Sequence, residues 1–293
     1  MTLRRAPPGA GEGTGDLEAL PLSWECARSF QTRASGRERM EKPKIPLDEY
    51  RKKRRFDVTR EPEGKKVSPG PRNRSAKKLA FVVQKHRATA LHYDLRLEWN
   101  GVMLSWAVPK GPSYDPSIKR LAVHVEDHPI EYNKFEGIIP EGEYGGGTVM
   151  IWDRGTWIPE SPDVDVALKK GDLKLKFDGA KLKGSWVLVR TGDRARRAAA
   201  DSSEPAKTPW LLIKHRDEWA STDDVTELLP RSTVTDRLMI EIARDEGGDL
   251  MKAADGDPPS ARRQLLENPA LLAPAKKKGR KKSVWHSNRG GGS

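Results

Sequence analysis

Short apolar runs separated by turn residues fill the middle of the chain. They are rich in β-branched and aromatic side chains, and several alternate apolar with polar positions, which is the period of a half-buried strand. The runs are LAFVVQKH (79–86), LHYDLRLEW (91–99), VMLSWAVP (102–109), RLAVHVEDH (120–128), TVMIW (148–152), TWIP (156–159), LKLKF (173–177), SWVLVR (185–190) and WLLIKH (210–215). Asn100-Gly101 predicts a tight hairpin, and Asp153-Arg154-Gly155 predicts a three-residue hairpin loop. The pattern therefore predicts an all-β domain, either a barrel or a sandwich.

The segments around this region carry weaker signals. We expect a short helix within 47–55, an inserted loop at 195–208, and helical turns within 235–244 and 262–267. Gly, Pro, Arg and Ser dominate the beginning of the chain without periodicity, which is typical of disorder. The predicted organisation is a disordered extension over 1–44, a β domain over 45–220, and a weakly helical segment followed by a disordered basic tail over 221–293. Met1 and Met40 both remain possible starts.

Composition and charge exclude some classes of protein. The longest apolar run, Leu79 to Val83, is far too short to span a bilayer as a helix. The single cysteine, Cys26, excludes an intramolecular disulfide and a cysteine-cluster zinc site. The N-terminus has no apolar segment typical of a secretory signal, so a cytoplasmic protein is expected.

Basic residues are concentrated in two segments. The chain has 54 Lys and Arg against 42 Asp and Glu, a net charge of +12. Residues 51–78 contain twelve basic and three acidic side chains, and residues 276–282 contain six basic ones. Such segments favour polyanions, with nucleic acid first, although a basic tail can also act only by increasing solubility.

Two predicted strands carry unusual polar faces. Side chains alternate along a strand, so 91–99 places Leu91, Tyr93, Leu95, Leu97 and Trp99 on one face and His92, Asp94, Arg96 and Glu98 on the other. In 120–128 the even positions include Arg120, His124, Glu126 and His128. Solvent-facing strand positions usually carry Lys, Glu, Thr and Ser, so histidine, arginine and carboxylate in these rows favour a functional face over a solvated one.

The spacing His86-x5-His92-x-Asp94 supplies two imidazoles and a carboxylate. This N/O set suits Mn, Fe, Zn or Co, and the spacing does not choose among them. His92-x-Asp94 together with His128 also resembles the facial triad of non-haem iron oxygenases. Arg96, Lys110 and Arg120 as neighbours favour a phosphate over a keto acid as substrate.

At the level of whole motifs the chain resembles one family closely. The runs FVVQKHRATALHYDLRLEWNGVMLSWAVPKGPS and KRLAVHVEDHPIEYNKFEGIIPEGEYGGGTVMIWDRGTW, with LDEYRKKRRFDVTREPEG before them and LKLKFDGAKLKGSWVLVR and TPWLLIKHRDEWA after them, resemble the 3′-phosphoesterase domain of bacterial DNA ligase D. The resemblance covers about residues 45–220. It implies a compact antiparallel β-barrel with short helices, here in a stand-alone form.

The resemblance also implies an activity and a site. The family uses manganese to process DNA 3′ ends in end joining, where it removes a terminal ribonucleoside and then the 3′-phosphate. Matched by position, the metal ligands are His86, His92 and Asp94. The matched residues around the scissile phosphate are Arg96, Lys110, Arg120 and His128, with Glu126, Tyr132 and Glu61 as further active-site positions. Implied partners are DNA 3′ ends, a separate DNA ligase and the end-binding Ku protein, with no membrane.

In this scheme His128 serves as a general acid or as a phosphate ligand. No serine or cysteine nucleophile with a flanking base is apparent, which favours attack by water. Two alternatives remain, namely a non-catalytic DNA-end-binding module on the same fold and an iron-dependent oxygenase.

One position departs from the family pattern. The family usually has Arg-Asp-Phe near the N-terminus of the domain, whereas this chain has Arg54-Arg55-Phe56-Asp57. Because that segment is associated with the phosphatase step, we expect Arg55 to slow the step unless Asp57 replaces the missing carboxylate.

A second motif is expected to have no catalytic role. Residues 176–179 read Lys-Phe-Asp-Gly, as in the nucleotidyltransferase motif of DNA ligases. The motif lies between two predicted strands, and too few residues follow it for the rest of a ligase, so a turn is favoured.

Overall fold

The computed structural model describes residues 47–65, 78–192 and 209–267 of the chain. Over these residues the strands are β1 (Leu79–Arg87), β2 (Leu91–Trp99), β3 (Val102–Val108), β4 (Arg120–His128), β5 (Gly137–Ile139), β6 (Gly147–Pro159), β7 (Asp172–Gly179), β8 (Lys183–Arg190) and β9 (Pro209–Lys214). The helices are α1 (Asp48–Lys52), the 3₁₀ turn η1 (Ile130–Lys134), α2 (Val164–Lys170), α4 (Val225–Leu228), α5 (Met239–Glu246), α6 (Leu250–Ala254) and α7 (Pro259–Glu267).

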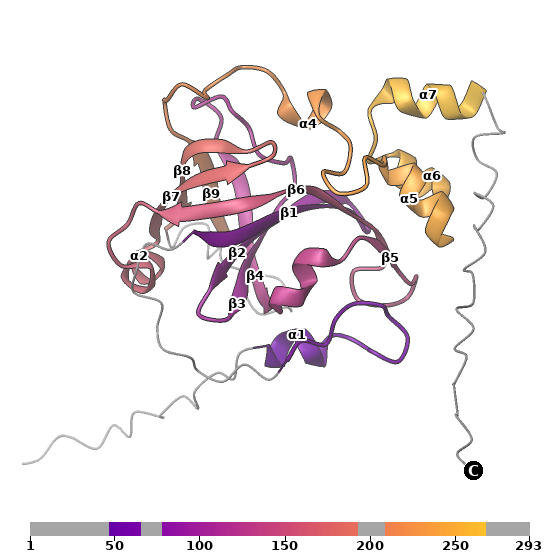
Figure 1. Ribbon diagram of the computed structural model, residues 1–293, viewed down its shortest axis with the longest axis horizontal. Coiled ribbons are helices and arrows are strands. Elements are labelled where there is room, and N and C mark those ends of the chain that lie inside the picture. The colour runs from indigo at the N-terminus through magenta and orange to yellow at the C-terminus, as the bar shows by residue number, and fades with distance from the viewer. Residues whose placement is uncertain (1–46, 66–77, 193–208, 268–293) are drawn as a thin grey trace, which may run out of the picture. The chain divides into compact units, whose positions relative to one another are not determined.

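The strands close into an antiparallel barrel. The order is β1-β2-β3-β4-β9-β8-β7-β6, and β1 also pairs with β6, so eight strands form a closed ring (Figure 1). β5 pairs with β6 as an additional short strand outside this ring. Closure leaves no unpaired edge in the ring, and the predicted all-β barrel is confirmed.

The hairpin between β2 and β3 forms where the sequence predicts it. Trp99 pairs with Val102, and both turn residues are left-handed, with φ of 49° at Asn100 and 83° at Gly101. Two consecutive left-handed residues match a tight two-residue turn whose twist suits the flanking strands. This local signal fixes the register that later places the side chains of β2.

The predicted hairpin loop at Asp153-Arg154-Gly155 is wrong. These residues lie inside β6, which pairs with β1 across a register shift at Val83/Gln84. The Asp153 carboxylate accepts hydrogen bonds from the backbone N–H groups of Lys181 and Leu182, at 2.9 and 2.7 Å. A Cβ on Gly155 would lie 2.3 Å from the Asp178 carbonyl oxygen, so glycine permits close approach of β7. Asp153 and Gly155 therefore belong to an irregular part of β6 and to its close contact with β7, and they do not form a turn.

The main apolar core lies inside the barrel and continues under the C-terminal helices. Trp106, Trp152, Trp157 and Trp186 are fully buried in it. The same cluster also contains Met239, Ile242 and Ala243 of α5 and Ala253 of α6. All described residues fall in one compact unit, which continues past residue 220, where the sequence predicts the end of the β domain.

A second, smaller apolar cluster covers one outer face of the barrel. It joins Leu47 and Tyr50 of the α1 region to Tyr132 of η1 and to Val149 of β6. The polar face of β2 lies beneath this layer, where Asp94 is 7% and Arg96 is 3% exposed. This face is therefore not the solvated side of a sheet.

The other sequence expectations have mixed outcomes. The helix predicted within 47–55 is α1, and the two predicted near the C-terminus correspond to α5 and α7. The extension 1–44, the loop 195–208 and the tail from residue 269 lie outside the described residues. None of the helices seen in the described part of the chain combines the length and apolar content needed to cross a bilayer.

Candidate active site

Two histidines and an aspartate meet on the β1–β2 hairpin. His86 of β1 pairs directly with His92 of β2, and Gln84 pairs with Asp94. All three side chains project from the same outer face of this antiparallel pair. One potential ligand atom from each of His86, His92 and Asp94 lies within 4.8 Å of the others. The register between these two strands, which follow each other in the chain, is therefore enough to bring the three potential ligands together.

Hydrogen bonds from the backbone orient both imidazoles. His86 donates from Nε2 to the carbonyl oxygen of Gly145 at 2.8 Å, and His92 donates from Nδ1 to that of Ala90 at 3.0 Å. The opposite nitrogens, His86 Nδ1 and His92 Nε2, each lie 3.7 Å from an Asp94 oxygen. Metal-binding histidines usually donate their other N–H to a carbonyl or carboxylate in this way. The residues therefore fit a divalent metal in both donor set and orientation.

Arg96 keeps the Asp94 carboxylate charged. Its Nη2 donates to Asp94 Oδ2 at 2.9 Å, while Nε and Nη1 donate to Gln84 and Ser105. Burial by itself would raise the pKa of Asp94, but Arg96, His86 and His92 lower that pKa below its ordinary value. Burial lowers the pKa of His92. Both groups are thus in the forms that bind metal.

A cavity of about 450 Å³ opens beside these ligands. His86, His92, Asp94 and Arg96 line it, together with Glu126, His128 and Tyr132 of the predicted set. The remaining lining residues include Arg54, Tyr144 and Gly145. The structure therefore brings most of the residues implied by the resemblance to one cavity.

Arg54 is a central residue of this cavity that the sequence analysis did not include in the site. Its guanidinium bonds Glu61 at 2.9 Å, Glu126 at 3.3 Å and His128 Nε2 at 3.1 Å. It also stacks 3.9 Å from the Tyr50 ring centroid. Arg54 is the arginine of the Arg-Arg-Phe motif at 54–56, so the motif contained the signal. The contacts could not be read from it because they span 72 and 74 residues for Glu126 and His128.

His128 is held as a neutral imidazole. Its Nδ1 donates to the Glu126 carbonyl oxygen at 2.9 Å, and its Nε2 accepts a hydrogen bond from Arg54. Burial lowers the pKa of His128 well below its usual value, and the charges of Arg96 and Arg54 lower it further. In this state the ring offers a lone pair at Nε2 and carries no proton there.

Glu61 is not among the described residues that line the cavity and lies behind Tyr132, which does line it. Glu61 is 4% exposed and accepts hydrogen bonds from Arg54 and from the Tyr132 hydroxyl, which is 2.9 Å away. Burial raises the pKa of Tyr132, so the phenol keeps its proton and remains the donor. The Tyr132 ring also lies 4.8 Å from the Arg96 guanidinium carbon. Glu61 and Tyr132 thus position both arginines.

The predicted common face of Arg120, His124, Glu126 and His128 is wrong. Ser105 pairs with Val125 but Met103 pairs with His128, so β4 contains one extra residue between them. This bulge puts Glu126 and His128 on the cavity face and leaves His124 against Trp106 at 5.1 Å.

Arg120 and Lys110 are not among the described residues that line the cavity. Arg120 pairs with Leu212 of β9, and its charge contributes to the lowered pKa of Asp224. Lys110 is exposed and directly follows Pro109, which lines the cavity.

Arg55 and the ligase-like motif both lie on the surface. Arg55 is 67% exposed, 3.6 Å from Asp57 and 3.7 Å from Glu143. The motif at 176–179 forms the end of β7, where Phe177 is in the core and Asp178 pairs with Lys183 at 2.8 Å. These contacts give that motif a structural role.

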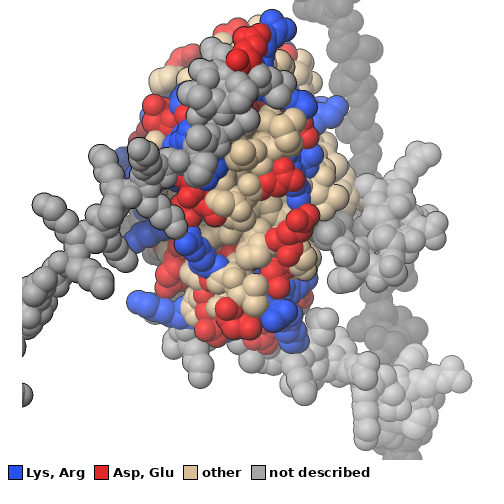
Figure 2. All heavy atoms as spheres, turned by 90° about the vertical axis from the view of Figure 1, so that its right-hand side faces the viewer, with Lys and Arg blue, Asp and Glu red and all other residues tan. Residues whose placement is uncertain are grey.

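Surface charge is mixed on the side of the molecule that Figure 2 shows. Lysine and arginine are interspersed with aspartate and glutamate there and form no continuous basic area over the described residues. Within the predicted basic segment 51–78, residues 66–77 lie outside the described part of the chain, as does the whole of 276–282. Among the described residues, the arginines that line the cavity are Arg54 and Arg96.

Comparison with known proteins agrees with this geometry. Residues 84–190 match the family model described as the DNA Ligase D 3′-phosphoesterase domain. The matched segment begins at Gln84 and contains the three metal-type ligands, Arg96 and His128. Residues 84–190 belong to this domain family.

Several multifunctional non-homologous end joining proteins named LigD are similar to the phosphoesterase domain. The protein of Pseudomonas aeruginosa is 47% identical over 198 residues, which is 67% of this chain and 22% of that protein. The protein of Mycobacterium tuberculosis is 49% identical over 115 residues, 39% of this chain and 15% of that protein. The protein of Mycolicibacterium smegmatis is 43% identical over 150 residues, 50% of this chain and 19% of that protein. The chain thus spans less than a quarter of each of these relatives and shares with them the phosphoesterase region.

Proposed function

We propose that this protein is a Mn²⁺-dependent hydrolase that processes DNA 3′ ends in end-joining repair. It removes a 3′-terminal ribonucleoside, leaving a 3′-phosphate, and then removes that phosphate. The observation that carries the proposal is the His86, His92 and Asp94 set, with both imidazoles oriented by backbone carbonyls beside two arginines and a neutral histidine. The similarity to LigD proteins supports the DNA substrate.

When bound, the divalent ion supplies a Lewis acid that polarises a phosphoryl oxygen. His86 Nδ1, His92 Nε2 and a carboxylate oxygen of Asp94 would hold it, because these atoms converge while their partner atoms are bonded elsewhere. Manganese suits this mixture of nitrogen and oxygen donors, as do other divalent ions of similar hardness.

The arginines bind and orient the phosphate. Arg96 lines the cavity and has donors beyond the three that bond Asp94, Gln84 and Ser105, so it can reach a phosphoryl oxygen. Arg54 also lines the cavity and can do the same. Fixed cations in a cavity with little water stabilise the charge that develops in phosphoryl transfer.

His128 accepts and then donates a proton at Nε2. That nitrogen carries no proton and its lone pair accepts a hydrogen bond from Arg54, so it can take up a proton when a bound phosphate draws the guanidinium away. A bound phosphate would also offset the two arginine charges that lower the pKa of His128. Once protonated, the ring can donate to the leaving oxygen as a general acid.

Further parts of the proposal rest on the similarity to LigD proteins and on the charge of the chain. We propose Lys110 and Arg120 as additional phosphate contacts that would require substrate-induced movement, since neither lines the cavity. A DNA ligase and the end-binding Ku protein are proposed partners at the same DNA ends.

A labelled primer–template with one 3′ ribonucleotide tests the activity. With Mn²⁺ present, we expect a band ending in 3′-phosphate to appear first and a band ending in 3′-hydroxyl to follow. EDTA and His92→Ala should each abolish both bands, because either removes the metal.

Other outcomes distinguish the alternatives. Retention of the primer in a gel-shift assay without cleavage in any divalent metal would indicate a DNA-end-binding module. Full cleavage by His92→Ala would remove the proposed ligand set. Consumption of O₂ with Fe²⁺ and a keto acid would favour the oxygenase.

A further inference from the structure

The C-terminal helices α5 and α6 contact three segments that surround the active site. Arg60, next to Glu61, pairs with Glu246 at the end of α5 at 2.6 Å. Arg87, next to His86, pairs with Asp255 just after α6 at 3.3 Å. Lys252 of α6 donates from Nζ to the carbonyl oxygen of Gly146 at 3.3 Å. Each of these contacts has at least one partner outside residues 84–190, the range that the family model matches.

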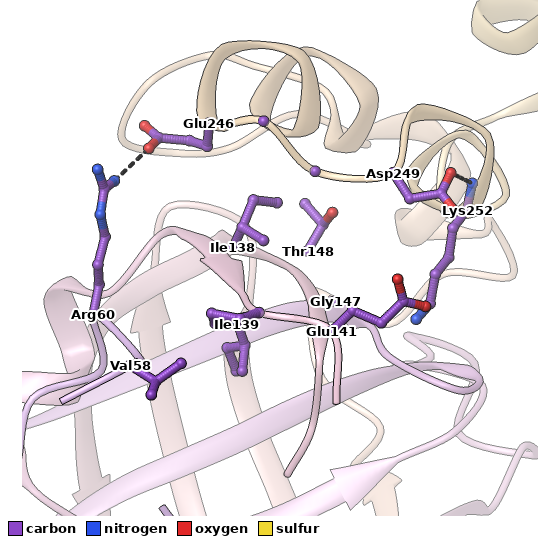
Figure 3. Close-up of a pocket in the computed structure, with 13 residues that line it drawn as sticks. Val58, Arg60, Ile138, Ile139, Glu141, Gly147, Thr148, Glu246, Asp249 and Lys252 are labelled. Carbon is purple, nitrogen blue, oxygen red and sulfur yellow. Dashed lines mark hydrogen bonds and ion pairs between the residues drawn. The ribbon is translucent and has the colours of Figure 1, made fainter. Parts of the chain in front are cut away.

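A cavity of about 450 Å³ lies where the end of α5 and the start of α6 meet β5 and β6. Figure 3 shows the Arg60–Glu246 pair at one end and Lys252 at the other, with Ile138, Ile139 and Thr148 between them. Ile139 also lines the metal-site cavity, so the segment that follows it, residues 140–147, forms the wall between the two cavities. This wall carries Gly145 and Gly146.

The wall is packed directly against a metal ligand. The Gly145 carbonyl oxygen accepts the hydrogen bond from His86 Nε2. A Cβ on Gly145 would lie 3.4 Å from His86 Cε1, and one on Gly146 would lie 2.7 Å from the Pro140 carbonyl oxygen. The loop therefore has little room to shift without moving the carbonyl that orients His86.

We propose that Lys252 is a positioning residue for the metal site. Its ammonium holds the Gly146 carbonyl from the side opposite the metal cavity, and the neighbouring Gly145 carbonyl then fixes the tautomer and ring direction of His86. Lys252 acts through the loop and contacts neither metal nor substrate. The inference rests on the proposed metal-dependent function and extends its machinery to α6.

Metal affinity provides the test. We would measure Mn²⁺ binding to the full chain by calorimetry for wild type, Lys252→Met and Lys252→Arg. Loss of an outer hydrogen bond at a metal site typically weakens binding by about 10- to 100-fold, and a contact one step further out should fall near the lower end, at about tenfold for Lys252→Met. Lys252→Arg keeps a donor and should bind like wild type.

A matched control and a second readout exclude a general effect of the helix. Met251 is the preceding residue of α6 and is 52% exposed, so Met251→Ala should leave Mn²⁺ affinity unchanged. In the metal-free protein, ¹⁵N NMR should show the Nε2–H form of His86 in wild type and a mixture of tautomers in Lys252→Met. If Lys252→Met fails to fold, Lys252→Gln, whose side chain is too short for this contact, takes its place.

Two outcomes overturn the inference. Wild-type affinity and an unchanged His86 tautomer in a folded Lys252→Met protein would overturn it while leaving the proposed function intact. Absence of metal binding by wild type itself would overturn both.

Discussion

Two arginines of this site each hold several other side chains in place. Arg96 bonds Asp94, Gln84 and Ser105, and Arg54 bonds Glu61, Glu126 and His128, so each arginine fixes groups that come from different strands or loops. Charge-assisted hydrogen bonds of this kind are about twice as strong as neutral ones and depend on the planar fork of the guanidinium. A change at either arginine should therefore disturb the metal ligand or His128 as well as phosphate binding.

Arg96→Lys should lower kcat/KM for both 3′-end activities by about 10- to 100-fold, which corresponds to ~1.4–2.8 kcal/mol. A lysine keeps the charge but cannot bond Asp94, Gln84 and Ser105 together. Steady-state kinetics on primers ending in a ribonucleotide or in a phosphate measures the effect.

Arg120→Lys is the comparison for this change. Arg120 is not among the described cavity-lining residues, so its replacement should have a smaller effect than that of Arg96. Equal losses at both positions would assign Arg120 to the phosphate in the substrate complex.

Arg55 should slow the phosphatase step and let 3′-phosphate ends accumulate. A positive charge can hold a phosphate product and cannot act as a base or metal ligand. Arg55→Asp should then speed conversion to the 3′-hydroxyl, as followed in a time course that resolves the two product bands. If the phosphate-ended band never builds up in wild type but does so in Asp57→Ala, Asp57 has taken over the role.

Among the structural elements, the bulge in β4 and the loop 140–147 decide which side chains face the proposed metal site. Val125 lines the cavity, and in a regular strand Glu126 and His128 would point to the face opposite Val125. One extra residue in β4 turns both of them toward the cavity as well. The loop is constrained by glycines, with φ of 78° at Gly145, a left-handed conformation that other residues rarely adopt. Small changes in the loop should therefore alter the orientation of the His86 ring.

Gly146→Ala should weaken Mn²⁺ binding, because its Cβ would lie 2.7 Å from the Pro140 carbonyl oxygen and force the loop to move. Calorimetric titration measures the affinity, and thermal unfolding checks the fold. Gly142→Ala is the control in the same loop. Its Cβ meets nothing within 4 Å, so it should cost only about 1–2 kcal/mol of stability from its φ of 88° and leave affinity near wild type. Equal affinities for the two variants would contradict the role of the loop.

For the whole molecule, the basic segment 276–282 and the active site have different locations in the sequence, whereas the basic segment 51–78 contains Arg54 of the site. The net charge of +12 comes largely from residues before the barrel, because acidic residues at 217–267 offset the basic tail, while the described face in Figure 2 is mixed in sign. The electrostatic attraction to DNA and the chemistry at its 3′ end should therefore be separable by truncation.

Removal of residues 269–293 should weaken DNA binding and flatten its dependence on salt. Each phosphate contact contributes about −0.9 to the slope of log affinity against log salt. Fluorescence anisotropy at several salt concentrations measures the slope, and cleavage at saturating DNA should change little. An unchanged slope would show that this basic segment does not contact DNA and serves only solubility.

The sequence by itself determined the parts of this protein that depend on local order. Alternation along 79–215 indicated the strands, Asn100-Gly101 set the hairpin, and His86, His92 and Asp94 could be placed together because they lie on consecutive strands. Motif resemblance then selected the barrel and the family.

Only the tertiary structure decided the features that need contacts between distant segments. It inserted a bulge into β4, joined Arg54 to His128 across 74 residues, buried the polar face of β2 under α1 and η1, and brought α6 to the loop beside His86. The physical reason is that a residue pattern records the period of one element and the face that it buries. The register, bulges and covering layers depend on how several elements pack together, and no single segment contains that information.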